Sequence, residues 1–221
     1  MNTPPLSLQE QIQHKRECIV KFIPQEECKL IFIGHSIGSY VILRLMEMFP
    51  MRSSHSILLF PTIANMIQTV DGKFWNLVTS YFKLPLLWVA HFSSYLPYAI
   101  QDVLIQWRAK WRAIDARIVP VCRRCVSWNV LNQGFRMVET ELVEVTDISP
   151  EMSDIIRRNA NRLTVYYGDG DAWTPKHFYE DFVEKFPEVN AIFGKDGFKH
   201  DFVLDSSHGV ADLCHKFIPR F

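Results

Sequence analysis

A serine that lies between two glycines is the residue pattern in this chain best suited to carry chemistry. Gly34, Ser36 and Gly38 form a G-x-S-x-G pentapeptide, with His35 and Ile37 between them. This is the sequence of a nucleophile elbow, a turn so tight that the serine adopts a strained backbone conformation and the flanking glycines must lack a Cβ. The expected chemistry is attack by Ser36 on an acyl group, with the Ile37 amide at the start of the next helix donating to the oxyanion.

The residues on either side have the strand–turn–helix order that an elbow needs. Residues 29–33 are a short apolar run typical of a buried strand, and residues 39–49 indicate an amphipathic helix. This context favours a serine hydrolase over an ordinary strand-to-helix turn with Ser36 as its cap. A serine at this position also argues against the related enzymes that use aspartate there to open epoxides or displace halide.

An acid should follow the serine along the chain, just after a later strand. Asp171 lies in the loop after the strand predicted at residues 163–167 and is the favoured acid. Asp169 is closer to the end of that strand and is the competitor, with turn formation as its alternative role. The acid would orient and stabilise a catalytic imidazolium.

The base should lie on a loop after the last strand. His200 follows the strand predicted at residues 189–193 and precedes the C-terminal helix. His208 is the rival, but it lies at the start of that helix. The predicted triad is therefore Ser36 as nucleophile, His200 as general base and then acid, and Asp171 as the orienting acid.

These residues need a scaffold, and the hydrophobic pattern supplies one. Strands are expected at residues 29–33, 55–60, 163–167 and 189–193, and helices at 7–23, 37–49, 175–186 and 208–219. Alternating strands and helices predict an α/β fold with a doubly wound parallel sheet. We expect three parts: an elbow-bearing half at 1–73, an apolar and basic helical insertion at 74–160, and an acid- and base-bearing half at 161–221.

The insertion begins with an unusually apolar segment. From Leu84 to Gln101 there is no Asp, Glu, Lys or Arg, and this length is the lower edge for a membrane span. Pro85 and Pro97 interrupt the segment, so a bilayer-crossing helix is not expected. Two interpretations stay open: a kinked or interfacial lipid-contacting segment, and a helical cap with its apolar side on the core.

Tryptophans interleaved with basic residues follow this segment, as in membrane-interface anchors. The expected membrane-contacting residues are Trp88, Trp107, Arg108, Lys110, Trp111 and Arg112. A nucleic-acid partner is not expected, because no wider basic surface accompanies them. The acidic stretch from Glu139 to Asp154 is expected to be a solvated helical face.

Composition places few further limits on function. The 221 residues suffice for one core, and Lys+Arg and Asp+Glu are both 24, so no overall charge recruits nucleic acid. No signal peptide is expected, and five scattered cysteines suggest reduced thiols facing the cytosol. Cys122 and Cys125 have zinc-ligand spacing without a second pair nearby, so neither a metal nor another cofactor is expected.

Four runs of the sequence resemble the lipid droplet-associated hydrolase family. They are residues 30–40, residues 58–63, the segment from Tyr166 through Asp181, and His200-Asp201-Phe202, and the resemblance runs from about Gln9 to the end. It implies an α/β-hydrolase fold, residence on lipid droplets and the cytosolic face of the endoplasmic reticulum, and serine esterase activity toward sterol esters. The family positions carry over to Ser36, Asp171 and His200, and the apolar segment 74–105 matches a region implied to contact the droplet.

The sequence departs from a complete hydrolase at its N-terminal side. Only 33 residues precede Gly34, whereas the fold places several strands there, together with a loop that gives a second oxyanion amide. We therefore expect an N-terminally shortened form with an incomplete sheet and Ile37 as its one oxyanion donor. Two hypotheses follow: a hydrolase of sterol or other apolar esters at a droplet surface, or a catalytically impaired, droplet-bound interaction protein. A soluble thioesterase or small-ester hydrolase is the third and less favoured reading.

Overall fold

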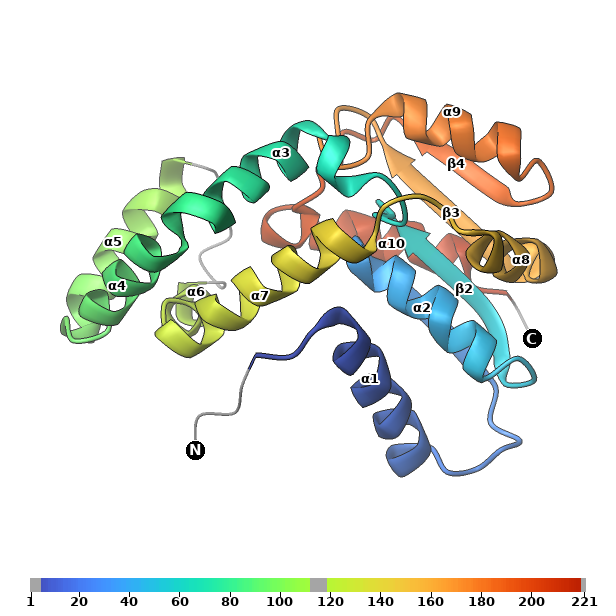
Figure 1. Cartoon of the computed structure of the whole chain (residues 1–221), viewed down its shortest axis with the longest axis horizontal. Helices are drawn as coiled ribbons and strands as arrows, with labels where there is room; N and C mark the ends of the chain where they lie inside the picture. Colours follow the sequence, from blue (N-terminus) through green and yellow to red (C-terminus); the bar gives the residue numbers. More distant parts are fainter. Residues whose placement is uncertain (1–4, 112–118, 220–221) are drawn as a thin grey trace.

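Four parallel strands form the centre of the fold (Figure 1). The computed structural model of the chain describes residues 5–111 and 119–219. The strands are β1 (Leu30–His35), β2 (Ser53–Leu59), β3 (Leu163–Gly168) and β4 (Asn190–Gly194), and they lie side by side in this order. The four strands predicted from the sequence are confirmed, with shifts of one or two residues at most of their ends.

The two central strands are buried because both of their faces are covered, β3 along its whole length and β2 from Ser56 onward. Ile57 and Leu58 of β2 and Val165 of β3 have no exposed surface. In the register of the sheet, Leu58 pairs with Gly34 on one side and with Val165 on the other. Among the strands that the structure describes, β1 and β4 form the two edges.

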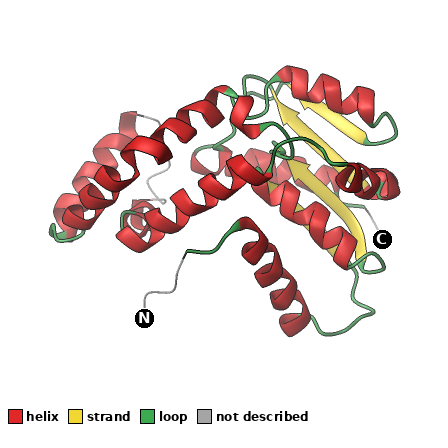
Figure 2. Ribbon diagram, viewed as in Figure 1, coloured by secondary structure: helices red, strands yellow, loops and turns green. Residues whose placement is uncertain are grey.

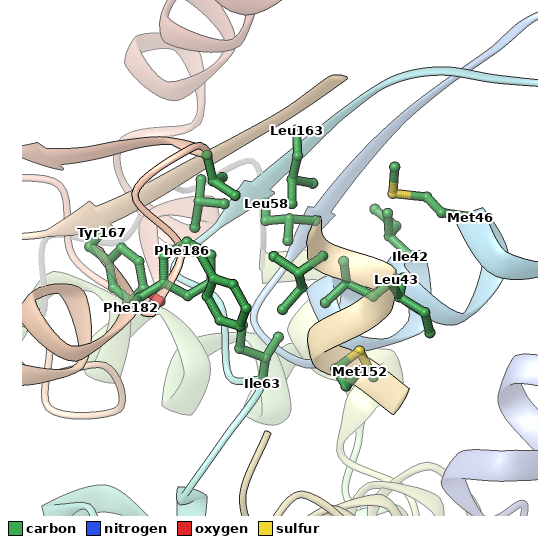
Figure 3. Close-up of a cluster of buried hydrophobic side chains, with 14 residues drawn as sticks. Ile42, Leu43, Met46, Leu58, Ile63, Met152, Leu163, Tyr167, Phe182 and Phe186 are labelled. Carbon is green, nitrogen blue, oxygen red and sulfur yellow. The ribbon is translucent and has the colours of Figure 1, made fainter. Parts of the chain in front are cut away.

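Helices cover both faces of this sheet (Figure 2), as the doubly wound α/β class requires. On one face lie α2 (Ile37–Met48), α8 (Pro150–Arg158) and α9 (Lys176–Lys185), and their side chains form the main core with Leu58 and Leu163 (Figure 3). On the other face, α10 (Ser207–Phe217) packs Val210 and Cys214 against Phe60 and Tyr166. The predicted fold class is confirmed.

The first helix, α1 (Leu8–Phe22), begins at a capping box in which Ser7 and Glu10 satisfy each other's backbone amides. Its buried residues Leu8 and Ile12 pack against Leu142 of α7 (Trp128–Glu144). Only the first half of α1 is anchored in this way. The remainder of the helix lies at the surface, with Phe22 exposed.

A group of helices, here called the cap, connects β2 to α8. It contains α3 (Val70–Leu77), a π-helical turn (Val78–Phe82), α4 (Lys83–Ser93), α5 (Tyr98–Trp111), α6 (Val119–Cys125) and α7. The cap extends sideways from the ends of the strands (Figure 1). Leu87 of α4 packs with Phe135 of α7 and holds two of the cap helices together.

The charge-free segment from Leu84 to Gln101 forms most of α4 and the start of α5, with Pro97 in the turn between them. Leu87, Ala90 and Gln101 are buried, whereas most of its other large side chains are exposed. Within residues 5–111 and 119–219, no helix combines the length and the hydropathy that crossing a bilayer demands.

The acidic stretch from Glu139 to Asp154 is not uniformly solvated, so that expectation was wrong at Glu141. This residue is 8% exposed, because it follows Met137 and Val138 at helical spacing and shares the side of α7 that packs inward. Burial raises the pKa of the Glu141 carboxyl to about 7. Glu139, by contrast, forms a partly exposed ion pair with Lys83 at 2.7 Å.

Candidate active site

The turn between β1 and α2 holds Ser36 in a rare backbone conformation, with φ 55° and ψ −125°. A Cβ on Gly34 would lie 2.5 Å from Ile42 Cδ1 and 2.7 Å from the Gly38 carbonyl oxygen, so a side chain does not fit there. A Cβ on Gly38 would meet nothing within 4 Å. The steric reason expected from the pentapeptide therefore holds for Gly34 and is wrong for Gly38.

Three predicted residues, far apart in the sequence, meet at the carboxyl ends of the strands. His200 Nε2 lies 2.9 Å from Ser36 Oγ, and His200 Nδ1 lies 2.7 Å from Asp171 Oδ2. The two competitors lie elsewhere: Asp169 is an exposed residue directly after β3, and His208 is exposed in the first turn of α10.

Asp171 is held as a buried anion. Its side chain has no exposed surface, and Oδ1 accepts hydrogen bonds from the backbone amides of Trp173 at 2.7 Å and Thr174 at 3.2 Å. Oδ2 accepts from the Thr174 hydroxyl at 2.7 Å. Burial acts to raise the pKa of Asp171, but its hydrogen bonds, first of all that from His200, outweigh burial and keep the pKa below its usual value.

This charge state fixes the direction of the hydrogen bonds. An ionised carboxylate can only accept, so His200 Nδ1–H donates to Asp171. In the neutral imidazole, the other ring nitrogen, Nε2, is then an acceptor, and the Ser36 hydroxyl donates to it. The arrangement can remove a proton from Ser36 as its oxygen attacks an electrophile.

Ile37, the predicted oxyanion donor, directly follows Ser36 in the structure. Ile37 is the first residue of α2, and its N–H is one of the helix amides without an intrahelical acceptor. The positive end of the helix dipole supports an anion at this point.

Two residues that sequence reasoning did not select lie against the triad. The His35 ring lies 4.9 Å from the His200 ring, centroid to centroid, and 4.8 Å from that of Phe202. Burial, with a smaller effect of the neighbouring His200, lowers the pKa of His35 to about 4, so His35 stays neutral beside the base. The buried Thr62 hydroxyl lies 3.4 Å from Ser36 Oγ. His35 and Thr62 both lie within the sequence runs that resemble the hydrolase family, and this resemblance is the only sequence feature that could have selected them.

An apolar cavity of about 490 Å³ lies within the cap. Phe74 and Trp75 of α3, Ala90 of α4 and Phe135 of α7 are among its lining residues, and the one hydroxyl there, that of Ser93, donates to a helix carbonyl. Asp71 lies in the first turn of the same helix α3, and its pKa is raised by burial and then by the charge of Asp171.

The outside of α4 and α5 exposes many large apolar side chains. They include Leu84, Trp88, Phe92, Val103, Leu104 and Trp107, each at least half exposed. Of the six residues expected to contact a membrane, Trp88, Trp107 and Lys110 are exposed. Arg112 and the side chains of Arg108 and Trp111 lie outside the part of the chain that the structure describes.

Solved structures with this architecture are α/β hydrolases, which is the class that the fold defines. One is an α/β hydrolase enzyme from a Medee basin deep-sea metagenome library, with a TM-score of 0.65, 13% identity, and coverage of 98% of this chain and 74% of that one. Another, from work on the carboxylesterases of the ammonia-oxidizing thaumarchaeon Nitrososphaera gargenis, has a TM-score of 0.62, 14% identity, and coverage of 97% of this chain and 72% of that one.

The sequence narrows this class to one family. The sequence model described as lipid-droplet associated hydrolase matches residues 1–203, so the chain belongs to that family. The lipid droplet-associated hydrolase of Rattus norvegicus is 32% identical over 96% of this chain, and that of Gallus gallus is 28% identical over 93%. The chain spans 64% and 63% of these two relatives, slightly less than two thirds of their length.

Proposed function

We propose that this chain is a serine hydrolase of apolar lipid esters that acts at the surface of a lipid droplet or of the endoplasmic reticulum. Ser36 is the nucleophile, His200 the general base and then acid, Asp171 the orienting acid, and Ile37 supplies an oxyanion amide. The observation that carries the proposal is the continuous hydrogen-bond chain from Asp171 through His200 to Ser36. Sterol esters are the substrate class that we propose within the apolar lipid esters.

Acylation follows from the directions of these hydrogen bonds. Ser36 Oγ attacks the ester carbonyl carbon while its proton passes to His200 Nε2. The imidazolium that forms is stabilised by the buried Asp171 carboxylate, and the carbonyl oxygen becomes an oxyanion that accepts from the Ile37 amide. The intermediate collapses, and His200 returns its proton to the departing alcohol.

Deacylation repeats these steps with water as the nucleophile. His200 Nε2 takes a proton from the water, whose oxygen attacks the acyl carbon. When the second intermediate collapses, Ser36 Oγ leaves with the electron pair of its bond to carbon and recovers a proton from His200. The acid is released and the starting arrangement is restored.

The cavity in the cap supports the proposal of a lipid substrate. We propose that its cavity receives an apolar part of the ester, since its volume falls in the range of small-molecule sites and its lining offers almost no polar partner. In the division of the chain that we propose, residues 1–73 and 161–221 hold the catalytic groups, and residues 74–160 provide contact with lipid.

The exposed apolar side chains of α4 and α5 support contact with a lipid surface. Large exposed apolar patches on globular proteins mark interaction sites, and these side chains form such a patch. Moving one such side chain from water into hydrocarbon is worth about 1.5–3 kcal/mol, so a few of them suffice to hold the protein at a lipid monolayer. A monolayer over neutral lipid accepts such side chains without a transmembrane exit.

Labelling with a fluorophosphonate probe tests the proposed chemistry. The parent chain should be labelled and should hydrolyse a cholesteryl ester presented in lipid emulsion, and Ser36→Ala should do neither. His200→Gln should abolish turnover, whereas His208→Gln, in the exposed first turn of α10, should retain it. An unlabelled parent chain that still binds droplets would favour the catalytically impaired interaction protein, and labelling that survives Ser36→Ala would identify another nucleophile.

A further inference from the structure

The Thr62 side chain is a buried hydroxyl directed at the nucleophile. Thr62 is 1% exposed and lies in the loop after β2, where its backbone amide donates to the Ser36 carbonyl oxygen at 3.4 Å. The Ser36 amide in turn donates to Leu59, the last residue of β2, at 3.0 Å. The loop and the turn that carries Ser36 are thus fastened to each other by main-chain hydrogen bonds on both sides.

Within the described residues, the Thr62 hydroxyl has one hydrogen-bond partner, Ser36 Oγ, at 3.4 Å. A buried hydroxyl without a partner is costly, so the contact is favoured even at this long distance. Catalytic hydrogen bonds in enzymes without bound substrate are often long, and they tighten as the reaction proceeds.

Counting protons identifies the donor. Ser36 has a single hydroxyl proton, and this proton points at His200 Nε2, which accepts because Nδ1 donates to Asp171. Ser36 Oγ therefore presents only lone pairs to Thr62. The Thr62 hydroxyl must be the donor and Ser36 Oγ the acceptor.

We propose that Thr62 is a further catalytic residue, whose hydroxyl donates to Ser36 Oγ and stabilises the negative charge that this oxygen carries during the reaction. The inference rests on the proposed function of Ser36 as nucleophile. As the Ser36 proton moves to His200, Oγ gains negative charge before its bond to the acyl carbon is complete. A donor that is already in place becomes charge-assisted at that moment, and hydrogen bonds to charged acceptors are stronger than those to neutral ones.

The same contact serves deacylation. Ser36 Oγ is then the leaving group, and it takes the electron pair of the carbon–oxygen bond before it recovers the proton from His200. The Thr62 donor again meets the oxygen when its negative charge is greatest. In the acyl-enzyme between these steps, Oγ is a weakly basic ester oxygen, so Thr62 favours the two transition states over the intermediate.

The rate of fluorophosphonate labelling tests this role, because it reports the nucleophilicity of Ser36 without a lipid substrate. In the full chain, Thr62→Val removes the hydroxyl but keeps the branched shape, and Thr62→Ser keeps the hydroxyl. We expect Thr62→Val to slow labelling by about ten- to a hundred-fold, the effect of one hydrogen bond to a charged group, and Thr62→Ser to restore most of the rate. Thr164→Val is the matched control, because this buried threonine of β3 bonds His55 and Asn190 and does not contact the triad.

Each other outcome has a definite meaning. Labelling of Thr62→Val at the parental rate would overturn the proposal, and so would equal slowing in Thr62→Val and Thr62→Ser, because the hydroxyl would then not be the cause. If Thr62→Val does not fold, Thr62→Ala provides a second variant without the hydroxyl, and thermal unfolding of each variant identifies the folded ones. A parent chain without Ser36-dependent labelling would instead remove the proposed function, and this role of Thr62 with it.

Discussion

Lowering the pH should destabilise the folded chain through His35, the histidine beside His200, the proposed base. Burial, and secondarily the neighbouring His200, lowers the pKa of His35 from 6.5 to about 4. Between these two pH values, the unfolded chain binds a proton at His35 that the folded chain does not bind. Stability from this group is therefore fully present above pH 6.5 and is lost as the pH falls toward 4.

The size of the effect follows from the width of this window. Each pH unit inside it costs at most about 1.4 kcal/mol of unfolding free energy, so the whole window is worth at most about 3.5 kcal/mol. The His35 ring is partly exposed, and solvent screening reduces the effect. We expect a loss of about 1–2 kcal/mol between neutral pH and pH 4.

Glu141 acts in the opposite direction over part of the same range. Burial raises the pKa of its carboxyl from 4.5 to about 7, so stability from Glu141 is fully present below pH 4.5 and is lost as the pH rises toward 7. The pH dependence of the parent chain contains both effects. Differences between the parent and single variants separate them.

Urea denaturation at several pH values from about 7.5 to about 4 measures the effect. His35→Phe and His35→Gln remove the titrating group with side chains of different shape, so a pH-dependent change common to both cannot arise from packing. The stability of the parent relative to either variant should fall with decreasing pH, and its stability relative to Glu141→Gln should rise. Parallel curves for the parent and both His35 variants would refute the assignment of a neutral, buried His35.

Three further predictions concern the triad and the cap. Asp171→Asn should lower turnover by about four orders of magnitude, because His200 loses its orienting anion. Asp169→Asn, at an exposed position, should leave turnover unchanged, and steady-state ester hydrolysis measures the turnover of both variants. Gly134→Phe should lower the hydrolysis of long-chain relative to short-chain p-nitrophenyl esters by about ten-fold or more, because a Cβ at Gly134 meets no atom within 4 Å and the added ring can fill the cavity. Gly134→Ala is the control, and an unchanged ratio in Gly134→Phe would exclude the cavity as a substrate site. Phe92→Asp should weaken flotation with phospholipid-coated oil droplets by at least about ten-fold, whereas Met51→Asp, at another exposed apolar residue just before β2, should not. Equal weakening by both substitutions would argue against α4 as the lipid contact.

The sheet and the meeting of Ser36, His200 and Asp171 could be predicted because local signals determine them. Short, largely apolar runs indicated buried parallel strands. Because the carboxyl ends of parallel strands meet at one edge, the loops that carry Asp171 and His200 were expected near Ser36, and the structure brings all three together. The helix predicted at residues 208–219, which the structure has at Ser207–Phe217, also set His208 apart from His200.

The contacts of His35, Thr62 and Glu141 could not be predicted, because they depend on tertiary geometry. Thr62 reaches Ser36 only because the chain turns at Phe60, which has φ 49°, and no residue type signals that turn. Glu141 is polar in sequence, yet its position on α7 places it between inward-facing residues. The sequence does not decide between a cap and a lipid-contacting segment for residues 84–101, because this segment is apolar around its whole circumference and has no periodicity that identifies a buried face.

The backbone of Ser36 has a consequence for how this protein can change over time. At φ 55° a serine is strained, and such conformations cost about 1–3 kcal/mol each, which a glycine would largely relieve. Under the proposed function, selection for thermal stability alone would favour glycine at position 36, and selection for ester cleavage would oppose it. In a lineage that kept the proposed droplet contact but no longer needed hydrolysis, this position should be among the first to change. The residue at position 36 in natural variants would then mark whether the proposed activity is retained.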